Sequence, residues 1–379
     1  MIPTSLRTPS AGPSENRPSD DRKVAGAAAT VTPRFYFSPG NAGECDESVL
    51  ARWWEHAGLD GLGELIEALL AQSIDLSRAR MGMEQKVAIC AASASDGDGP
   101  SLEPAMHSLI SHMAEFQHIR ASAIAKLSAT YVRFLILSER VRNTEHSIAL
   151  HQSIADRKAH ERSDSGERSH AGRSSSSPIA ELHAFRETLS GDLNAALLAL
   201  SEQLCEPADV TRARMDGHCL PANMASVPNV GSPAALASRR PDLVALEHCV
   251  LRQENGGEGA YLELRLAQLD YEQACIAAIT AVDHAINRMV TAIASLVPAR
   301  ACAANADAGA RAAQAELRKG NSGIEAVSYA HVARFNFNDR EIVIRGETYL
   351  ALVQLFQALG GGWESEDFML GENPAEGAA

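Results

Sequence analysis

Apolar residues recur at alternating three- and four-residue steps over most of this chain, which predicts helices. The longest such pattern runs from about residue 101 to 160. Its apolar positions are Met113, Ile124, Leu127, Tyr131, Phe134, Val141, Ile148 and Ala155. Such a 3.5-residue period is typical of a coiled coil. A helix of about 55 residues is roughly 80 Å long, so we expect it to pack against another long helix.

The first half of the chain predicts one complete helical hairpin. A helix is expected from about Glu64, after a glycine-rich break, and it fades before the long helix begins. The polar stretch Glu161–Ser177 then forms a hairpin tip. A return helix follows from Pro178 to about Leu204. The long helix and the return helix should therefore lie antiparallel.

The second half repeats this order. One helix begins at Pro241 and a long helix follows from Tyr261. The stretch Arg318–Gly323 forms the second tip, and a last helix runs over 324–359 until the glycines at 360–362 end it. We predict an all-α fold of two long antiparallel helical hairpins related by an internal repeat.

The stretch Val227–Glu247 joins the two repeats. Ser232 is expected to cap a short helix in which Pro233 occupies the first turn, and Pro241 starts the next helix. The expected organisation is a disordered segment over 1–43, a first hairpin repeat over 44–226, a second over 227–364 and a disordered tail over 365–379.

Two local patterns conflict with this plan. Residues 333–345 alternate like a strand hairpin, although the surrounding repeat predicts a helix there. Pro298 lies inside the long helix of the second half, where it should kink or break that helix.

Composition and charge exclude several classes of function. The 379 residues carry a net charge of −14, which argues against a nucleic-acid surface. The seven cysteines are scattered with no C-x-x-C pair, so we expect free or core thiols. No stretch is expected to span a membrane as a helix, and no signal peptide is visible. Read as written, the chain would stay in the cytoplasm.

No motif predicts catalysis or a bound cofactor. His107, His112 and His118 lack the i, i+4 spacing of a helical metal pair, and His248 with Cys249 has no further ligand at suitable spacing. Arg239 and Arg240 are expected to neutralise nearby charge. We therefore predict a non-enzymatic protein without a metal or cofactor.

Three stretches together resemble the TolC-type outer membrane efflux protein family, in its NodT-like branch. They are the tryptophan-containing stretch Trp53–Arg80, the mid-chain Ser232–Glu247 and the closing Leu352–Glu364. Asp75 and Leu76 stand where the family's opening signature has them, whereas Ser73 replaces its usual Asn. The three stretches follow one another in the family's order and spacing, and the resemblance covers about Asp46 to Glu364.

The resemblance implies a homotrimeric outer-membrane duct that works with a periplasmic adaptor protein and an inner-membrane transporter. It also implies that the hairpin tips dock the adaptor, through an Arg four residues before a Gly. Arg168 and Gly172 match this spacing, with Ser175 close behind, although an ordinary polar turn would look the same. At the second tip Gly320 fits, but Glu316 stands where the Arg should be.

The chain departs from the family in the segments that should form the membrane barrel. The gaps at 91–104 and 252–260 are too short for two strands, since each membrane-spanning strand needs about 9–11 residues. We therefore expect little or no β-barrel. The alternative to an efflux duct is a soluble coiled-coil scaffold or a truncated, non-functional remnant of the family.

Overall fold

The computed structural model describes residues 35–37, 46–95, 102–165, 178–224, 227–254 and 261–363, and every regular element there is a helix. The helices are α1 (Glu47–Ala51), α2 (Trp53–His56), α3 (Leu62–Gln72), α4 (Ile74–Ser95), α5 (Leu102–Ser165), α6 (Pro178–Leu204), α7 (Ala208–Met215), the 3₁₀ helix η2 (Pro233–Ala235), α8 (Leu236–Arg239), α9 (Pro241–Glu254), α10 (Tyr261–Arg318) and α11 (Ile324–Ala358). The all-α prediction is confirmed.

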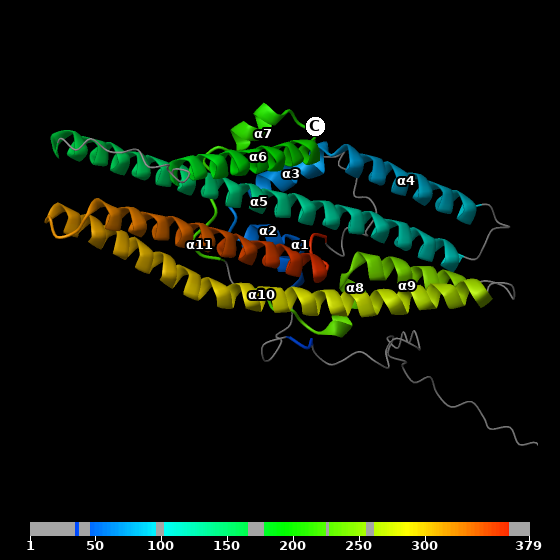
Figure 1. Cartoon of the computed structure of the whole chain (residues 1–379). Coiled ribbons are helices and arrows are strands. Elements are labelled where there is room, and N and C mark those ends of the chain that lie inside the picture. Colours follow the sequence, from blue (N-terminus) through cyan, green and yellow to red (C-terminus); the bar gives the residue numbers. More distant parts are fainter. Residues whose placement is uncertain are drawn as a thin grey trace, which may run out of the picture. The chain divides into compact units, whose positions relative to one another are not determined.

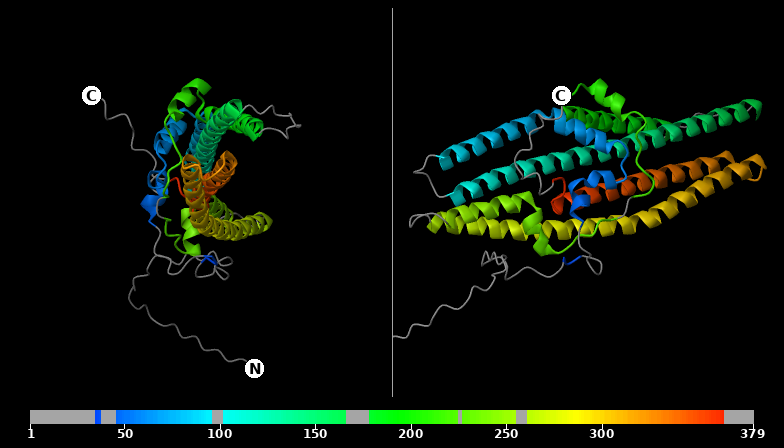
Figure 2. Two further views of the ribbon diagram at one scale, coloured as in Figure 1. Left: turned by 60° about the vertical axis from the view of Figure 1, so that its left-hand side comes forward. Right: turned by 180° about the vertical axis from the view of Figure 1, so that it is seen from behind.

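The long helices form the two expected hairpins. Helix α5 packs against α6 in the first hairpin, and α10 packs against α11 in the second. The hairpins meet where α5 contacts α11 along one side, and α4 and α9 also pack against α5 (Figure 1). The turn between α10 and α11 lies at the same end as the C-terminal end of α5 (Figure 2).

The repeat boundaries stay predictions. The described residues belong to one compact unit, 32–379. Of the expected disordered segments, 365–379 and all of 1–43 except 35–37 fall outside the described residues. Within 35–37, Phe35 is buried, and the backbone N–H of Phe37 donates to Asp283 Oδ1 on α10.

The start of the ordered chain follows local capping chemistry. Asp46 caps α1, because its carboxylate accepts hydrogen bonds from the Ser48 backbone N–H at 3.0 Å and hydroxyl at 2.6 Å. These bonds lower the pKa of Asp46. The single helix expected from Glu64 is wrong, since Ser73 is extended between α3 and α4. Its hydroxyl accepts from the Leu76 N–H at 3.3 Å and begins a new helix.

The prolines act only partly as expected. Pro241 begins α9, as predicted, and Ser232 precedes η2, but its side chain makes no capping hydrogen bond. Of the kink or break expected at Pro298, the break is wrong, because α10 continues through it. Pro298 lies on an exposed face, as does Ala294 one turn earlier. Water is therefore available to the carbonyl group that the proline leaves without an N–H partner.

The ambiguous stretch at 333–345 is helical throughout and lies within α11. Its alternating apolar residues fit a helix because the two sides of α11 face different neighbours, α10 and α5. Gly346 follows directly on this segment. A methyl group at Gly346 would lie 2.2 Å from the side chain of Ile136 on α5, so this glycine permits the close approach of the two hairpins.

Two helices contradict the expectation that no segment is suited to cross a membrane. By length and composition alone, α5 and α10 each contain a sufficiently apolar window of 18 residues. Half of the α5 window is buried inside the structure, as in the core helix of a soluble protein. Only 17% of the α10 window is buried, so this helix presents an apolar face to its surroundings.

Candidate functional site

The predicted docking residues are only partly described. Arg168, Gly172 and Ser175 lie outside the described residues. Gly320 lies in the turn between α10 and α11, with φ of +76°, a conformation that strains any residue with a side chain. A glycine at this position is therefore required by the turn itself.

Glu316 organises this second tip. Its carboxylate accepts a hydrogen bond from Lys319 Nζ at 2.8 Å and another from Asn321 Nδ2 at 2.9 Å. These two bonds lower the pKa of Glu316. Its backbone carbonyl also accepts from the Asn321 N–H at 3.0 Å, which closes the end of α10. The glutamate that replaces the expected arginine thus orders the turn.

The three sequence stretches that carry the family resemblance meet at one place. The rings of Trp53 and Phe356 stack with centroids 4.9 Å apart. The Gly362 N–H donates to the Leu50 carbonyl at 3.0 Å, so the closing glycines contact the beginning of the ordered chain. The indole N–H of Trp363 donates to the Arg239 carbonyl at 3.0 Å. No pattern in the sequence predicted that these stretches touch.

Arg240 completes this junction. Its guanidinium donates to both carboxylate oxygens of Asp242, at 3.0 and 2.6 Å, and to the Ala358 carbonyl at 3.1 Å. Burial would raise the pKa of Asp242, but the hydrogen bonds and charge of Arg240 lower it. Arg240 therefore neutralises a nearby charge, as expected. For Arg239, the buried Nε and Nη1 have no hydrogen-bond partner among the described residues.

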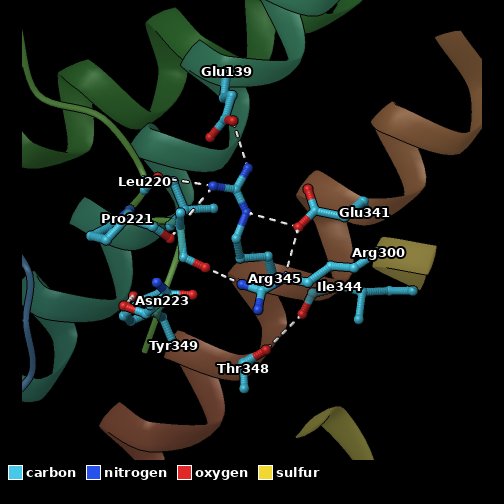
Figure 3. A network of polar contacts seen from close by, with 11 residues as sticks. Glu139, Leu220, Pro221, Asn223, Arg300, Glu341, Ile344, Arg345, Thr348 and Tyr349 are labelled. Carbon is cyan, nitrogen blue, oxygen red and sulfur yellow. Dashed lines mark hydrogen bonds and ion pairs between the residues drawn. The ribbon is translucent and has the colours of Figure 1, made fainter. Parts of the chain in front are cut away.

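A second polar centre surrounds Arg345 on α11 (Figure 3). Its guanidinium donates to Glu139 Oε1 on α5 at 2.5 Å and lies 3.3 Å from Glu341 Oε1. It also donates to the Leu220 carbonyl at 3.0 Å. Arg345 is 93% buried, so its charge requires these partners.

The same centre fixes the segment that crosses from the first repeat to the second. Tyr349 donates its hydroxyl proton to the Asn223 carbonyl at 2.9 Å, and Arg300 of α10 donates to the Ala222 carbonyl (Figure 3 labels Tyr349, Asn223 and Arg300). Arg300 also lies 3.5 Å from Glu341. Side chains of α10 and α11 thus bind the carbonyls of Leu220, Ala222 and Asn223 in this strap, which we define as residues 216–224.

The other end of the strap contacts the first repeat. Tyr131 on α5 donates its hydroxyl proton to the Asp60 carbonyl at 2.5 Å, and His218 Nδ1 lies 3.0 Å from the same hydroxyl oxygen. Burial raises the pKa of Tyr131 well above its usual range. Gly61, at φ +74°, passes so close to the His218 ring that a methyl group there would overlap it.

Two of the histidines considered as metal ligands, His107 and His248, lie in contact with each other. Across α5 and α9, His107 Nδ1 lies 2.9 Å from His248 Nδ1, whereas His112 contacts Glu115 at 3.3 Å. Over the described ranges, no three His, Cys, Asp or Glu side chains form a group suited to hold a metal ion. The six cysteines within those ranges are free thiols. The His107–His248 contact joins α5 to α9, whereas the His112–Glu115 contact lies within α5.

Comparison with known proteins gives a consistent result for the fold. No protein-family model and no curated protein matches this sequence. Among solved structures, the outer-membrane channel OprN superposes with a TM-score of 0.73 at 16% identity, over 93% of this chain and 99% of that channel.

Two further channels give similar values. The open state of the MtrE outer membrane channel from Neisseria gonorrhoeae matches with a TM-score of 0.70 at 14% identity, over 88% of this chain and 96% of that one. The CmeC outer membrane channel from Campylobacter jejuni matches with a TM-score of 0.67 at 14% identity, over 95% and 96%. The chain therefore has the helical-hairpin fold of the TolC-type outer-membrane channels, with no strand in the ranges that the structure describes.

Proposed function

We propose that this chain forms the helical wall of an exit duct in a tripartite efflux system. The observation that carries this proposal is the extent of the likeness to OprN, which spans almost the full length of both chains. A likeness confined to one hairpin would also fit many unrelated helical bundles. Here both hairpins, α5–α6 and α10–α11, take part in one arrangement. We accordingly propose a non-enzymatic role in transport.

The exposed face of α10 supports a homotrimer. It carries a row of apolar side chains that are at least 44% exposed: Tyr261, Leu262, Leu266, Leu269, Ile276, Val290 and Val297. An apolar surface of this length on a soluble part of a protein favours association, because water is released when it is covered. A duct built from copies of one chain would cover this face in a closed ring.

The partners are proposed from the same likeness. A periplasmic adaptor protein would dock at the hairpin tips, through Arg168, Gly172 and Ser175 at the first tip and Gly320 at the second. An inner-membrane transporter would supply the exported compounds, and the chain would act at the outer membrane. Because Glu316 holds the second tip through Lys319 and Asn321, we expect the first tip to supply the arginine contact.

A soluble coiled-coil scaffold, or a truncated and non-functional remnant, is the second candidate. It is favoured by the short connections at the end opposite the tips. Only six residues separate Ser95 from Leu102, and six separate Glu254 from Tyr261. A strand that crosses the outer membrane needs about 9–11 residues. Neither connection is long enough for one such strand, so a pore at the membrane would need another component.

Cell fractionation of the native protein, followed by chemical crosslinking, separates the candidates. A crosslinked trimer in the outer-membrane fraction supports the duct. A soluble trimer favours the scaffold, and a soluble monomer or an aggregate contradicts the duct and favours a non-functional remnant.

Variants on α10 test whether its apolar face is the contact between copies. Ile276→Glu and Val290→Glu each place a charge on this face, and we expect either to abolish the crosslinked trimer because burying an unpaired carboxylate is costly. Val210→Glu is the matched control, since Val210 is also an exposed apolar residue but lies on the short helix α7. Equal trimer yields from all three variants would show that the α10 face is not the interface.

A further inference from the structure

A cavity of about 420 Å³ lies within the first hairpin and its contact with α11. Ser147 and His151 of α5 line it, together with Leu182 and Phe185 of α6 and Phe335 of α11. Its volume is in the range of small-molecule binding sites. Because three helices contribute to the wall, the cavity is set by the packing of the long helices and not by a loop.

His151, which lines this cavity, has an unused hydrogen-bond acceptor. The side chain is 95% buried, and its Nδ1 lies 2.8 Å from the carbonyl of Ser147, one turn earlier on α5. A carbonyl only accepts, so Nδ1 carries the proton and donates, which leaves Nε2 with its lone pair. Nε2 is buried and has no partner among the described residues. Leaving such an atom unpaired costs about 1–3 kcal/mol.

Two aromatic rings form an apolar wall of the same cavity. The rings of Phe185 and Phe335 lie edge to face, with centroids 6.1 Å apart and planes at 87°. Leu182 and Val332 extend the apolar lining. An aromatic ring of a ligand gains both from apolar burial and from edge-to-face contacts with such a pair.

The polar part of the lining favours a ligand that donates hydrogen bonds and carries positive charge. Two carboxylates line the cavity, Glu181 and Asp339, and among the described residues no lysine or arginine lines it. Asp339 accepts both hydrogen bonds of Arg140, at 2.9 and 3.0 Å, and the Arg140 guanidinium lies 5.4 Å from the centre of the Phe185 ring. This ion pair closes one wall, while Glu181 stands exposed at the rim.

We propose that this cavity binds a small aromatic amine in its ammonium form. The ligand ring would pack against the contacting rings of Phe185 and Phe335, one N–H would donate to His151 Nε2, and the carboxylates would favour the positive charge. At about 30 Å³ for each water molecule in the liquid, the cavity has room for roughly a dozen non-hydrogen atoms. This site lies within the packed helices and is independent of the proposed duct function.

The direct test is a titration of the purified full-length protein with phenethylamine, followed by calorimetry. Two matched probes keep the ring and change the polar end: 2-phenylethanol is neutral and 3-phenylpropionate is an anion. We expect phenethylamine to bind about fivefold more tightly than the alcohol, and the carboxylate not to bind. The measurement needs neither trimer nor partner, so its failure is distinguishable from failure of the duct proposal.

Variants assign the binding to this cavity. His151→Phe removes the acceptor and should weaken phenethylamine binding at least about tenfold, whereas His151→Gln keeps an acceptor oxygen and should stay within about threefold of wild type. Glu181→Gln should weaken binding about threefold, through loss of charge at the exposed rim. Glu187→Gln is its matched control, because Glu187 is also on α6 but does not line the cavity. We expect this variant to bind as wild type does.

Three results would overturn the proposal. The first is equal affinity for the three probes, and the second is wild-type binding by His151→Phe with an unchanged circular dichroism spectrum. The third is no heat of binding with phenethylamine up to about 10 mM, in which case a buried water satisfies Nε2. If His151→Phe does not fold, the comparison of Glu181→Gln with Glu187→Gln decides, and equal affinities of those two variants contradict the proposed site.

Discussion

Arg345 Nη2 donates to Glu139 Oε1 at 2.5 Å, across 206 positions of sequence. The bond joins α11 of the second hairpin to α5 of the first. The same guanidinium donates to the Leu220 carbonyl of the strap that connects the two repeats. One buried side chain therefore links both hairpins and their connection, which makes it a main determinant of how the hairpins pack.

Replacing Arg345 with Met should destabilise the fold by about 3 kcal/mol. The variant keeps the apolar stem but leaves the Glu139 carboxylate and the Leu220 carbonyl without their donor, and it removes the ion pair with Glu341. Urea denaturation followed by circular dichroism measures the change in the free energy of unfolding. Arg78→Met is the control, because Arg78 forms an exposed ion pair with Asp75, and we expect a loss below about 0.5 kcal/mol. Similar losses in both variants would contradict this role for Arg345.

Two glycines within long helices should respond to alanine in opposite directions. Gly346→Ala should destabilise the protein by about 1–3 kcal/mol, since the new methyl group would lie 2.2 Å from Ile136. Gly309→Ala on α10 has no neighbouring atom within 4 Å and should stabilise the protein by roughly 0.5–1 kcal/mol, through the higher helix propensity of alanine. Thermal unfolding of both variants gives the signs, and a stabilising Gly346→Ala would mean that α5 and α11 are not in close contact.

His331 should make stability depend on pH. Burial and the nearby charge of Arg334 lower its pKa below the ordinary 6.5, and Gln314 Nε2 lies 2.8 Å from its Nε2. The unfolded chain therefore binds this proton more readily than the folded chain. The contribution to stability is present above about pH 6.5 and is lost as the pH falls below it.

The measurement compares urea midpoints of wild type and His331→Gln between pH 7.5 and 5, a range of about one pH unit or more on each side of the ordinary value. Glutamine is uncharged throughout this range, so we expect the variant to lose less stability on acidification than wild type. Parallel pH profiles of the two proteins would show that His331 does not contribute to the acid sensitivity.

The hydroxyl of Tyr131 should stabilise the contact between α5 and the turn before α3. Tyr131→Phe removes the hydrogen bond to the Asp60 carbonyl and the contact with His218, and we expect a loss of about 1–2 kcal/mol. Tyr261→Phe is the matched control, because Tyr261 is 73% exposed and should change stability little. Guanidinium denaturation of both variants measures the difference, which should vanish if the Asp60 contact does not form in solution.

Local pattern was sufficient for most of the long helices of this fold. The three/four spacing of apolar residues predicted α5, α6 and α10, while Pro178 and Pro241 predicted the starts of α6 and α9, and the glycines at 360–362 predicted the end of α11. The helical reading of 333–345 depended on the repeat and not on its own alternation. The errors at Ser73 and Pro298 share a cause: whether a helix continues there depends on a side-chain cap and on exposure to water.

The sequence alone determined an all-α chain with two hairpins, because helix periodicity, caps and breakers act over a few residues. Only the tertiary structure decided what meets across the hairpins. Arg345 with Glu139, Trp53 with Phe356, and the cavity at His151 bring together residues from separate helices. In another packing, each polar partner could have faced water. The energy of a polar contact depends on its burial, so the sequence of one helix does not determine it. Burial is a property of the assembled helices, and no single helix encodes it.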